Sequence, residues 1–309
     1  MRVEAESVLF AELLDGADVR DTPAIFILGS PRTGSTLFYQ CLVHYLRLPY
    51  FSNLANQISP NQPVLLAPAH RQIQSRIDIQ FTSAYGKTDG AWQPSEASAV
   101  MRHWFGGEHP SQLASATFLP EKVDHMVRTL AAMHRVFGAP VVIKNAWNCF
   151  RIAAIAQAMP RAYFLWIRRD LVASALSDLA ARYAVKGDPN QWNSATPANV
   201  ASLRQLPHWA QVVENQFEYA RAISGDLTEH ASDRHAIVWY ESFLRQPAEM
   251  IEDIAQKMPS LHHNQDRLPL TLTKVARSPR PYPESDEVNL HRYIVEHDAR
   301  LSALRHKAA

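Results

Sequence analysis

The chain has 309 residues, and 47% of them are hydrophobic, which is enough to bury the core of one large domain. Its 31 lysines and arginines nearly balance its 30 aspartates and glutamates, so the formal net charge at pH 7 is +1. This balance argues against nucleic-acid binding and against a polybasic membrane role, because both are typical of chains with excess lysine and arginine. No linker or internal repeat divides the sequence, and we expect a single domain over residues 1–309.

The N-terminal region gives no targeting signal. Its first 20 residues contain the acidic side chains Glu4, Glu6, Glu12, Asp15 and Asp18, unlike a secretory or transit peptide. No apolar run approaches the roughly 20 residues that a membrane-spanning helix needs. We therefore expect a cytoplasmic protein without integral membrane association. An amphipathic stretch around residues 8–14 leaves homo-oligomerisation open, although such stretches usually pack on their own domain.

The most informative segment begins with an apolar run at 24–28. It continues as Gly-Ser-Pro-Arg-Thr-Gly-Ser-Thr over residues 29–36 and then as a helical pattern over 37–45. The two glycines have the spacing of the nucleotide P-loop, so this pattern predicts a strand, a phosphate-binding loop and a helix. Ser35 stands where a P-loop has its lysine, and the nearest cation is Arg32. The missing lysine argues against nucleoside triphosphate chemistry.

Further along the chain, strand-like segments alternate with helical patterns. We predict strands at 24–28, 141–144, 162–167 and 235–239. The alternation indicates an α/β fold with a P-loop-like parallel sheet flanked by helices on both faces. A helical insertion over about 45–140 separates the first two strands and is expected to cover the site. Its predicted helices lie near 62–82, 95–104 and 120–137, and a later long helix lies near 208–225.

A second anion-binding pattern follows the strand at 162–167. Arg169 lies at the end of that strand, and Ser177 follows about two helical turns later. A guanidinium and a hydroxyl so placed can both address one phosphate, whereas an ATPase would need a carboxylate there for Mg²⁺. Two anion sites on neighbouring strands imply a ligand that is phosphorylated at two positions.

With these motifs the chain resembles the sulfotransferases that use 3′-phosphoadenosine 5′-phosphosulfate (PAPS), and most of all their bacterial single-domain branch. Residues 29–36 match the 5′-phosphosulfate loop, whose common form is P-[KR]-[ST]-G-[ST]-[ST], and 169–177 match the R-x7-S motif for the 3′-phosphate. Four further stretches carry the resemblance: 92–97, 141–148, 239–243 and 276–280.

The resemblance implies a set of donor contacts. Those residues are Arg32, Thr33, Gly34, Ser35 and Thr36 at the phosphosulfate, and Arg169, Ser177 and Arg277 at the 3′-phosphate or adenine. Other readings stay open. Arg169 could pair with Asp170 or Glu241, and Ser177 could be a surface residue. For Arg277 and Arg280 a solvated surface position is favoured, because the R-K-G form of the animal cytosolic enzymes is absent.

The resemblance also implies catalytic roles for Arg32 at the leaving phosphate, Lys144 at the sulfuryl or acceptor oxygens, and Glu96 as general base. Alternatively, Glu96 is the first-turn glutamate of a helix capped by Ser95, and Lys144 pairs with Glu241. His103, seven residues after Glu96, is a reserve base.

No metal is expected, because the sequence has no clustered aspartates or histidine pairs. The two cysteines, Cys41 and Cys149, lie in apolar helical patterns without metal-ligand spacing and are predicted to be buried thiols.

The predicted activity is in-line transfer of the sulfuryl group of PAPS to a hydroxyl, or an amine, of a small-molecule, lipid or carbohydrate acceptor. One alternative is a P-loop phosphotransferase, which would turn over ATP with Mg²⁺. Another is a non-catalytic nucleotide-binding module, in which a change at Glu96 would leave every activity unaltered. The insertion has no readable signature that identifies the acceptor.

Overall fold

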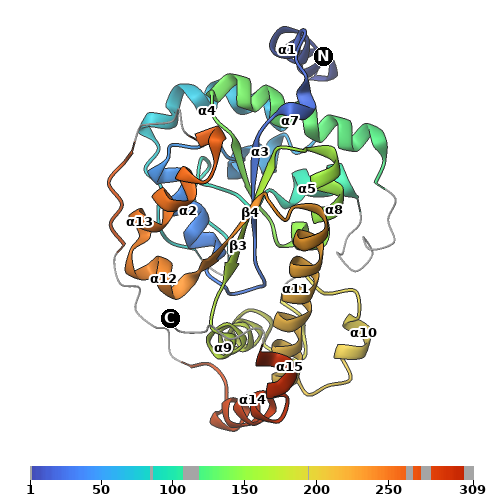
Figure 1. Cartoon of the computed structure of the whole chain (residues 1–309), viewed down its shortest axis with the longest axis vertical. Coiled ribbons are helices and arrows are strands. Elements are labelled where there is room, and N and C mark those ends of the chain that lie inside the picture. Colours follow the sequence, from blue (N-terminus) through green and yellow to red (C-terminus); the bar gives the residue numbers. More distant parts are fainter. Residues whose placement is uncertain are drawn as a thin grey trace.

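The computed structural model describes residues 2–83, 86–106, 118–193, 195–261, 267–272 and 280–302. Its centre is a parallel sheet (Figure 1). Its four strands have the order β2-β1-β3-β4. The strands are β1 (Ala24–Leu28), β2 (Val141–Lys144), β3 (Ala162–Arg168) and β4 (His235–Trp239). The predicted α/β class, the parallel pairing and the four strand positions are confirmed.

Alternate residues of β1 enter two separate hydrophobic cores, as the period of a strand requires. Phe26 and Leu28 belong to a core shared with α1, α5, α7, α8 and α11. Ile25 and Ile27 belong to a core shared with α2, α12 and α13. Every residue of β1 is therefore buried, which explains its unbroken apolar sequence.

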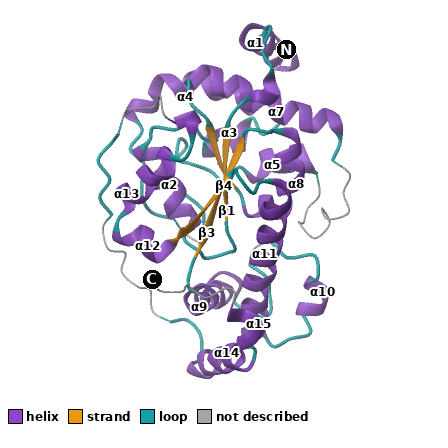
Figure 2. Ribbon diagram, viewed as in Figure 1, coloured by secondary structure: helices purple, strands orange, loops and turns teal. Residues whose placement is uncertain are grey.

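The helices of the two cores lie on opposite sides of the strands (Figure 2). On the first side are α1 (Arg2–Leu14), α5 (Ser98–Phe105), α7 (Pro120–Phe137), α8 (Ile152–Ala158) and α11 (His208–His230). On the second side are α2 (Ser35–Tyr45), α12 (Tyr240–Arg245) and α13 (Pro247–Gln256).

A third hydrophobic cluster lies beyond the carboxyl end of β3. It joins α11 to α9 (Leu171–Ala181), α14 (Glu284–Glu296) and α15 (Asp298–Leu301). Three short helices complete the described elements: α3 (Asn53–Ile58), α4 (Ala67–Ile73) and α10 (Val200–Leu203). No helix in the described ranges combines the length and apolar character needed to cross a membrane. Cys41 and Cys149 are free and buried, as predicted.

The insertion differs in part from its predicted form. The helix at 120–137 is confirmed, but the helix predicted at 62–82 is wrong in extent. Only α4 is α-helical there, with 3₁₀ segments on both sides. Residues 77–83 are irregular, because their backbone bonds to side chains instead of to a helical turn: Gln40 donates to the carbonyls of Gln80 and Thr82, and Gln93 accepts from Gln80 N.

The two-sided burial of the sheet makes a stability prediction. Phe164 on β3 is fully buried, with its ring centroid 5.8 Å from that of Phe26, whereas Ile237 on the edge strand β4 is 45% exposed. We expect Phe164→Ala to lower the free energy of unfolding by about 3–5 kcal/mol. Ile237→Ala is the control and should cost less than about 1 kcal/mol. Urea unfolding measures both, and equal losses would contradict the described packing.

Candidate active site

A cavity of about 950 Å³ lies at the carboxyl ends of the strands. Its wall includes the loop after β1, the end of β2 at Lys144, Arg169 after β3 and Tyr240 after β4. Parallel sheets bind ligands at this edge, because the loops that follow neighbouring strands meet there. The segments selected by the sequence motifs thus converge on one cavity.

The loop over residues 29–36 is held in a strained turn. Arg32 has φ of 69° and Gly34 has φ of 83°, both in the left-handed region. Within the loop, the hydroxyl of Thr33 donates to the carbonyl of Ser30 at 2.9 Å. Gln216 on α11 accepts from the hydroxyl of Ser30 and donates to the Pro31 carbonyl at 2.9 Å. These bonds present the N-terminus of α2, where an anion is favoured, to the cavity.

The two arginine motifs meet at this loop. Arg32 Nε donates to Ser177 Oγ at 3.1 Å, and Arg169 Nη1 donates to the carbonyl of Arg32 at 2.9 Å. The guanidinium of Arg169 also lies 5.0 Å from the centre of the Tyr240 ring. Ser177 is therefore a half-buried partner of the loop, and it is not among the described residues of the cavity wall.

The carboxylates that were considered as partners of Arg169 have other roles. Asp170 caps α9 by accepting from Ala173 N at 2.8 Å, and its own N–H donates to Glu241 at 3.0 Å. In the described parts of the chain, neither carboxylate forms an ion pair with Arg169. The interpretation of Arg169 as a structural ion-pair partner is wrong, and its guanidinium lies in the cavity wall.

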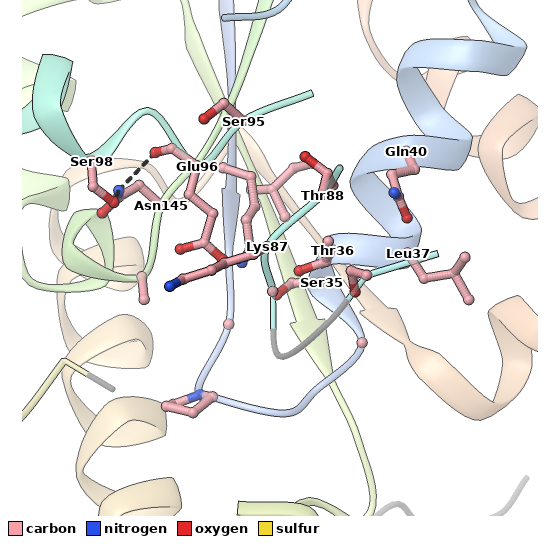
Figure 3. Close-up of a pocket in the computed structure, with 18 of the residues that line it drawn as sticks. Ser35, Thr36, Leu37, Gln40, Lys87, Thr88, Ser95, Glu96, Ser98 and Asn145 are labelled. Carbon is pink, nitrogen blue, oxygen red and sulfur yellow. Dashed lines mark hydrogen bonds and ion pairs between the residues drawn. The ribbon is translucent and has the colours of Figure 1, made fainter. Parts of the chain in front are cut away.

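Glu96 and Lys144 form an ion pair across the cavity. Lys144 ends β2 and is only 7% exposed, and its ammonium pairs with Oε1 of Glu96. Asn145 Nδ2 donates to the backbone carbonyl of Glu96 at 2.8 Å, the dashed line of Figure 3. The alternative pairing of Lys144 with Glu241 does not occur. The end of β2 therefore fixes both the side chain and the backbone of Glu96.

Glu96 lies outside the helix in which it was predicted. Ala97 has φ of 49° and its N–H donates to Ser95 Oγ at 3.1 Å, so α5 begins only at Ser98. The reading of Glu96 as the first-turn glutamate of a helix capped by Ser95 is wrong. Its side chain instead extends into the cavity, toward the side occupied by Ser35 and Thr36 (Figure 3).

The position of Gly86 shows how near the Glu96 carboxylate lies to the phosphate-binding loop. Gly86 has φ of 91°, and a Cβ there would lie 2.9 Å from Glu96 Oε1 and 3.8 Å from Thr36 Oγ1. Both side-chain oxygens therefore lie within 4 Å of one point. The Glu96 carboxylate and the start of α2 therefore lie close together.

Other candidate residues lie elsewhere. His103 is not among the described residues of the cavity wall. Its ring packs edge-on against His125 with centroids 5.3 Å apart, and its Nδ1 lies 3.5 Å from Lys122 Nζ. Burial lowers the pKa of His103 to about 4, and the charge of Lys122 adds to this shift. Arg277 lies outside the described residues, and Arg280 pairs with Glu287 on α14.

The sequence did not indicate several residues that the structure brings to the site. The helix α3 brings Asn53 and Asn56 to the wall; its one local signal is the capping residue Ser52, which accepts from Ala55 N at 3.1 Å. Lys87 and Gly86 come from an irregular segment with no periodic pattern. In the described ranges, no three histidine, cysteine, aspartate or glutamate side chains are grouped as metal ligands.

The close contact at Gly34 allows a prediction about stability. A Cβ there would lie 2.2 Å from the ring of Tyr240, so Gly34→Ala adds overlap to backbone strain. We expect a loss of about 2–4 kcal/mol in the free energy of unfolding. Gly138→Ala is the matched control, because Gly138 also has positive φ (71°) but no atom within 4 Å of the added Cβ.

Combining Gly34→Ala with Tyr240→Ala removes the overlapping ring and leaves only the strain. The double variant should therefore lose less stability than the sum of the single losses, by about 1–2 kcal/mol. Denaturant unfolding gives all four values. Strict additivity would show that the ring does not limit the turn.

Comparison with known proteins places this site in a family. The model of the family described as "Sulfotransferase family" matches residues 23–258. No curated protein matches the chain.

The solved structures that the chain is similar to include three bacterial sulfotransferases. That of Mycobacterium avium is 14% identical, with 94% of this chain and 72% of that chain covered and a TM-score of 0.45. That of Mycobacterium tuberculosis H37Rv is 15% identical, with 96% and 82% covered and a TM-score of 0.45. That of Alicyclobacillus acidocaldarius is 16% identical, with 93% and 97% covered and a TM-score of 0.45. The family match spans most of the chain, and the protein therefore belongs to the sulfotransferase family.

Proposed function

We propose that this sulfotransferase moves the sulfuryl group of PAPS to an acceptor hydroxyl, with Glu96 as the general base. The observation that carries the proposal is the nearness of the Glu96 carboxylate to Thr36, at the start of α2: oxygens of both side chains lie within 4 Å of the point where a Cβ on Gly86 would stand. A base and an anion-binding helix terminus are the two elements that transfer of an anionic group to a hydroxyl needs.

The side chains at the strand ends fit a donor that carries two phosphate groups. The N-terminus of α2 with Ser35 and Thr36 would hold the 5′-phosphosulfate. The hydroxyl of Thr33 already donates to the Ser30 carbonyl, and Thr33 is not among the described residues of the cavity wall. Arg169 and Ser177 would hold the 3′-phosphate, because both already contact Arg32 in the phosphosulfate loop. Tyr240 lies beside Arg169 and limits the room on that side.

The proposed reaction is a single in-line displacement. The acceptor oxygen bonds to sulfur while its proton passes to the Glu96 carboxylate. The bond between sulfur and the 5′-phosphate oxygen breaks, and its electron pair leaves with 3′-phosphoadenosine 5′-phosphate. Negative charge grows on that phosphate oxygen, so Arg32 and the N–H groups at the start of α2 stabilise the transition state.

Lys144 has two tasks in this proposal. Its ammonium fixes the Glu96 carboxylate in place, because the two groups pair directly. It also lies at the end of β2, beside the path of the sulfuryl oxygens. His103 is not assigned as the base, because a group with a pKa near 4 that faces Lys122 and His125 accepts protons poorly at neutral pH.

Removing the base tests the catalytic part of the proposal. We expect Glu96→Gln to lower kcat by about 10²- to 10⁴-fold while the affinity for 3′-phosphoadenosine 5′-phosphate stays within about threefold. The rate is measured as release of that nucleotide from PAPS with a panel of hydroxyl acceptors. Glu249→Gln, an exposed carboxylate on α13, is the control. An unchanged rate in Glu96→Gln would favour a different base or the non-catalytic module.

Calorimetric titration tests the donor site without any acceptor. The wild type should bind 3′-phosphoadenosine 5′-phosphate without metal and more tightly than ATP with Mg²⁺. Arg169→Ala should weaken this binding by about 2 kcal/mol or more, because a charged partner of the phosphate is lost. Arg204→Ala, at an exposed arginine after α10, should leave it unchanged. Preferential binding of ATP with Mg²⁺, or of neither nucleotide, would refute PAPS as the donor.

A further inference from the structure

One cation in the cavity wall is not used by the proposed reaction. Arg32 and Arg169 are assigned to the donor, and Lys144 is paired with Glu96. Lys87 also lines the cavity and is exposed in it. Within the described residues it forms no ion pair. Its ammonium is therefore available to a ligand.

Lys87 lies on a segment that is fixed in place. The hydroxyl of Thr88 donates to the Pro94 carbonyl at 2.7 Å, and Asn53 Nδ2 donates to both the carbonyl and the hydroxyl of Thr88 at 3.0 Å. On the other side, Gly86 passes close to the Glu96 carboxylate, where a Cβ would lie only 2.9 Å away. The backbone of Lys87 is thus held beside the proposed base.

The direction of the Lys87 side chain separates it from the donor loop. In Figure 3 it extends past Glu96 and ends on the side away from Ser35 and Thr36. Its amine therefore addresses the space that an acceptor would occupy while its hydroxyl faces Glu96. A role on the phosphosulfate itself is disfavoured by this direction.

The cavity wall carries amide and hydroxyl groups beside apolar side chains such as Leu37 and Phe81, and Gln40 lies on its α2 side, away from the Lys87 ammonium (Figure 3). Gln40 uses its Nε2 on two backbone carbonyls, at 2.6 and 2.9 Å, which leaves its side-chain oxygen for a ligand. Other polar residues of the cavity wall include Asn56, Gln57, Thr82 and Ser83. Such groups bind the hydroxyls of a polar molecule, whereas a largely apolar acceptor would leave them without partners.

The positive charge of Lys87 favours one kind of acceptor over another. An empty cavity lets water solvate the Lys87 ammonium, but a bound acceptor displaces that water. A neutral acceptor would leave the ammonium desolvated and uncompensated, and an anionic group would compensate it. Glu96 does not do so, because its carboxylate is paired with Lys144.

We propose that the acceptor is a polar hydroxyl compound that carries an anionic group, a carboxylate or a phosphate, and that Lys87 binds this group. The inference rests on the proposed function, because it takes the place of the donor and the base from it. Lys87 is then a residue that determines acceptor specificity, and the chemistry at sulfur is unchanged.

The test compares matched anionic and neutral ligands on protein saturated with 3′-phosphoadenosine 5′-phosphate. The pairs are 4-nitrophenyl β-D-glucuronide with the β-D-glucoside, and glucose 6-phosphate with glucose. Calorimetry should show that the anionic member of at least one pair binds about tenfold more tightly than the neutral one. Which pair shows the difference tells a carboxylate from a phosphate.

Variants at position 87 test whether Lys87 causes the preference for the anionic ligand. Lys87→Ala should lower the affinity for the anionic member about tenfold and leave the neutral member unchanged, and Lys87→Arg should keep most of the preference. Lys257→Ala, at an exposed lysine after α13, is the control and should have no effect.

Two failures are distinguishable. If the nucleotide binds but neither pair shows an anionic preference, or the preference survives Lys87→Ala, the acceptor inference is overturned and the proposed function stands. If the wild type does not bind the nucleotide, the proposed function fails and the acceptor inference fails with it.

Discussion

The ion pair between Lys144 and Glu96 is the interaction on which the rest of the site depends. A lysine at the end of a buried strand needs a partner, because an uncompensated buried ammonium is costly. Glu96 supplies that partner from the insertion, and Asn145 fixes its backbone from the same strand end. The sheet thereby positions a carboxylate that belongs to a segment distant in the sequence.

The phosphate-binding loop depends on a second set of long-range contacts. Its turn requires left-handed backbone at Gly34, which a glycine allows, and at Arg32, where a side chain makes this conformation costly. Gln216, on a helix from the far end of the domain, bonds to both Ser30 and Pro31. The loop is thus held open by α11, while Arg169 supports it from the end of β3.

Elements that depend only on neighbouring residues could be predicted from the sequence. The strands, the loop at 29–36 and the helix α7 follow from apolar runs, glycine spacing and a long amphipathic period, all contained in a few neighbouring residues. Side-chain bonds to distant backbone fix the other parts. Residues 77–83 are shaped by Gln40 and Gln93, and Lys87 is placed by Asn53 acting on Thr88. The periodicity of hydrophobic residues does not predict such long-range contacts. The start of α5, the helix α3 and the position of Lys87 could therefore not be predicted from the sequence.

The proposed reaction needs cations in the cavity, because it brings several negative groups together there. A carboxylate base close to an anionic sulfuryl donor is repelled by it, by about 3 kcal/mol for unit charges 6 Å apart at an effective dielectric constant of 20. A cation in direct contact with the carboxylate offsets this repulsion, because its distance is shorter, and Lys144 occupies that position. The same requirement applies to an anionic acceptor, which adds a third negative group to the cavity. Lys87, beside Glu96 and directed away from the donor loop, supplies the charge that such an acceptor needs.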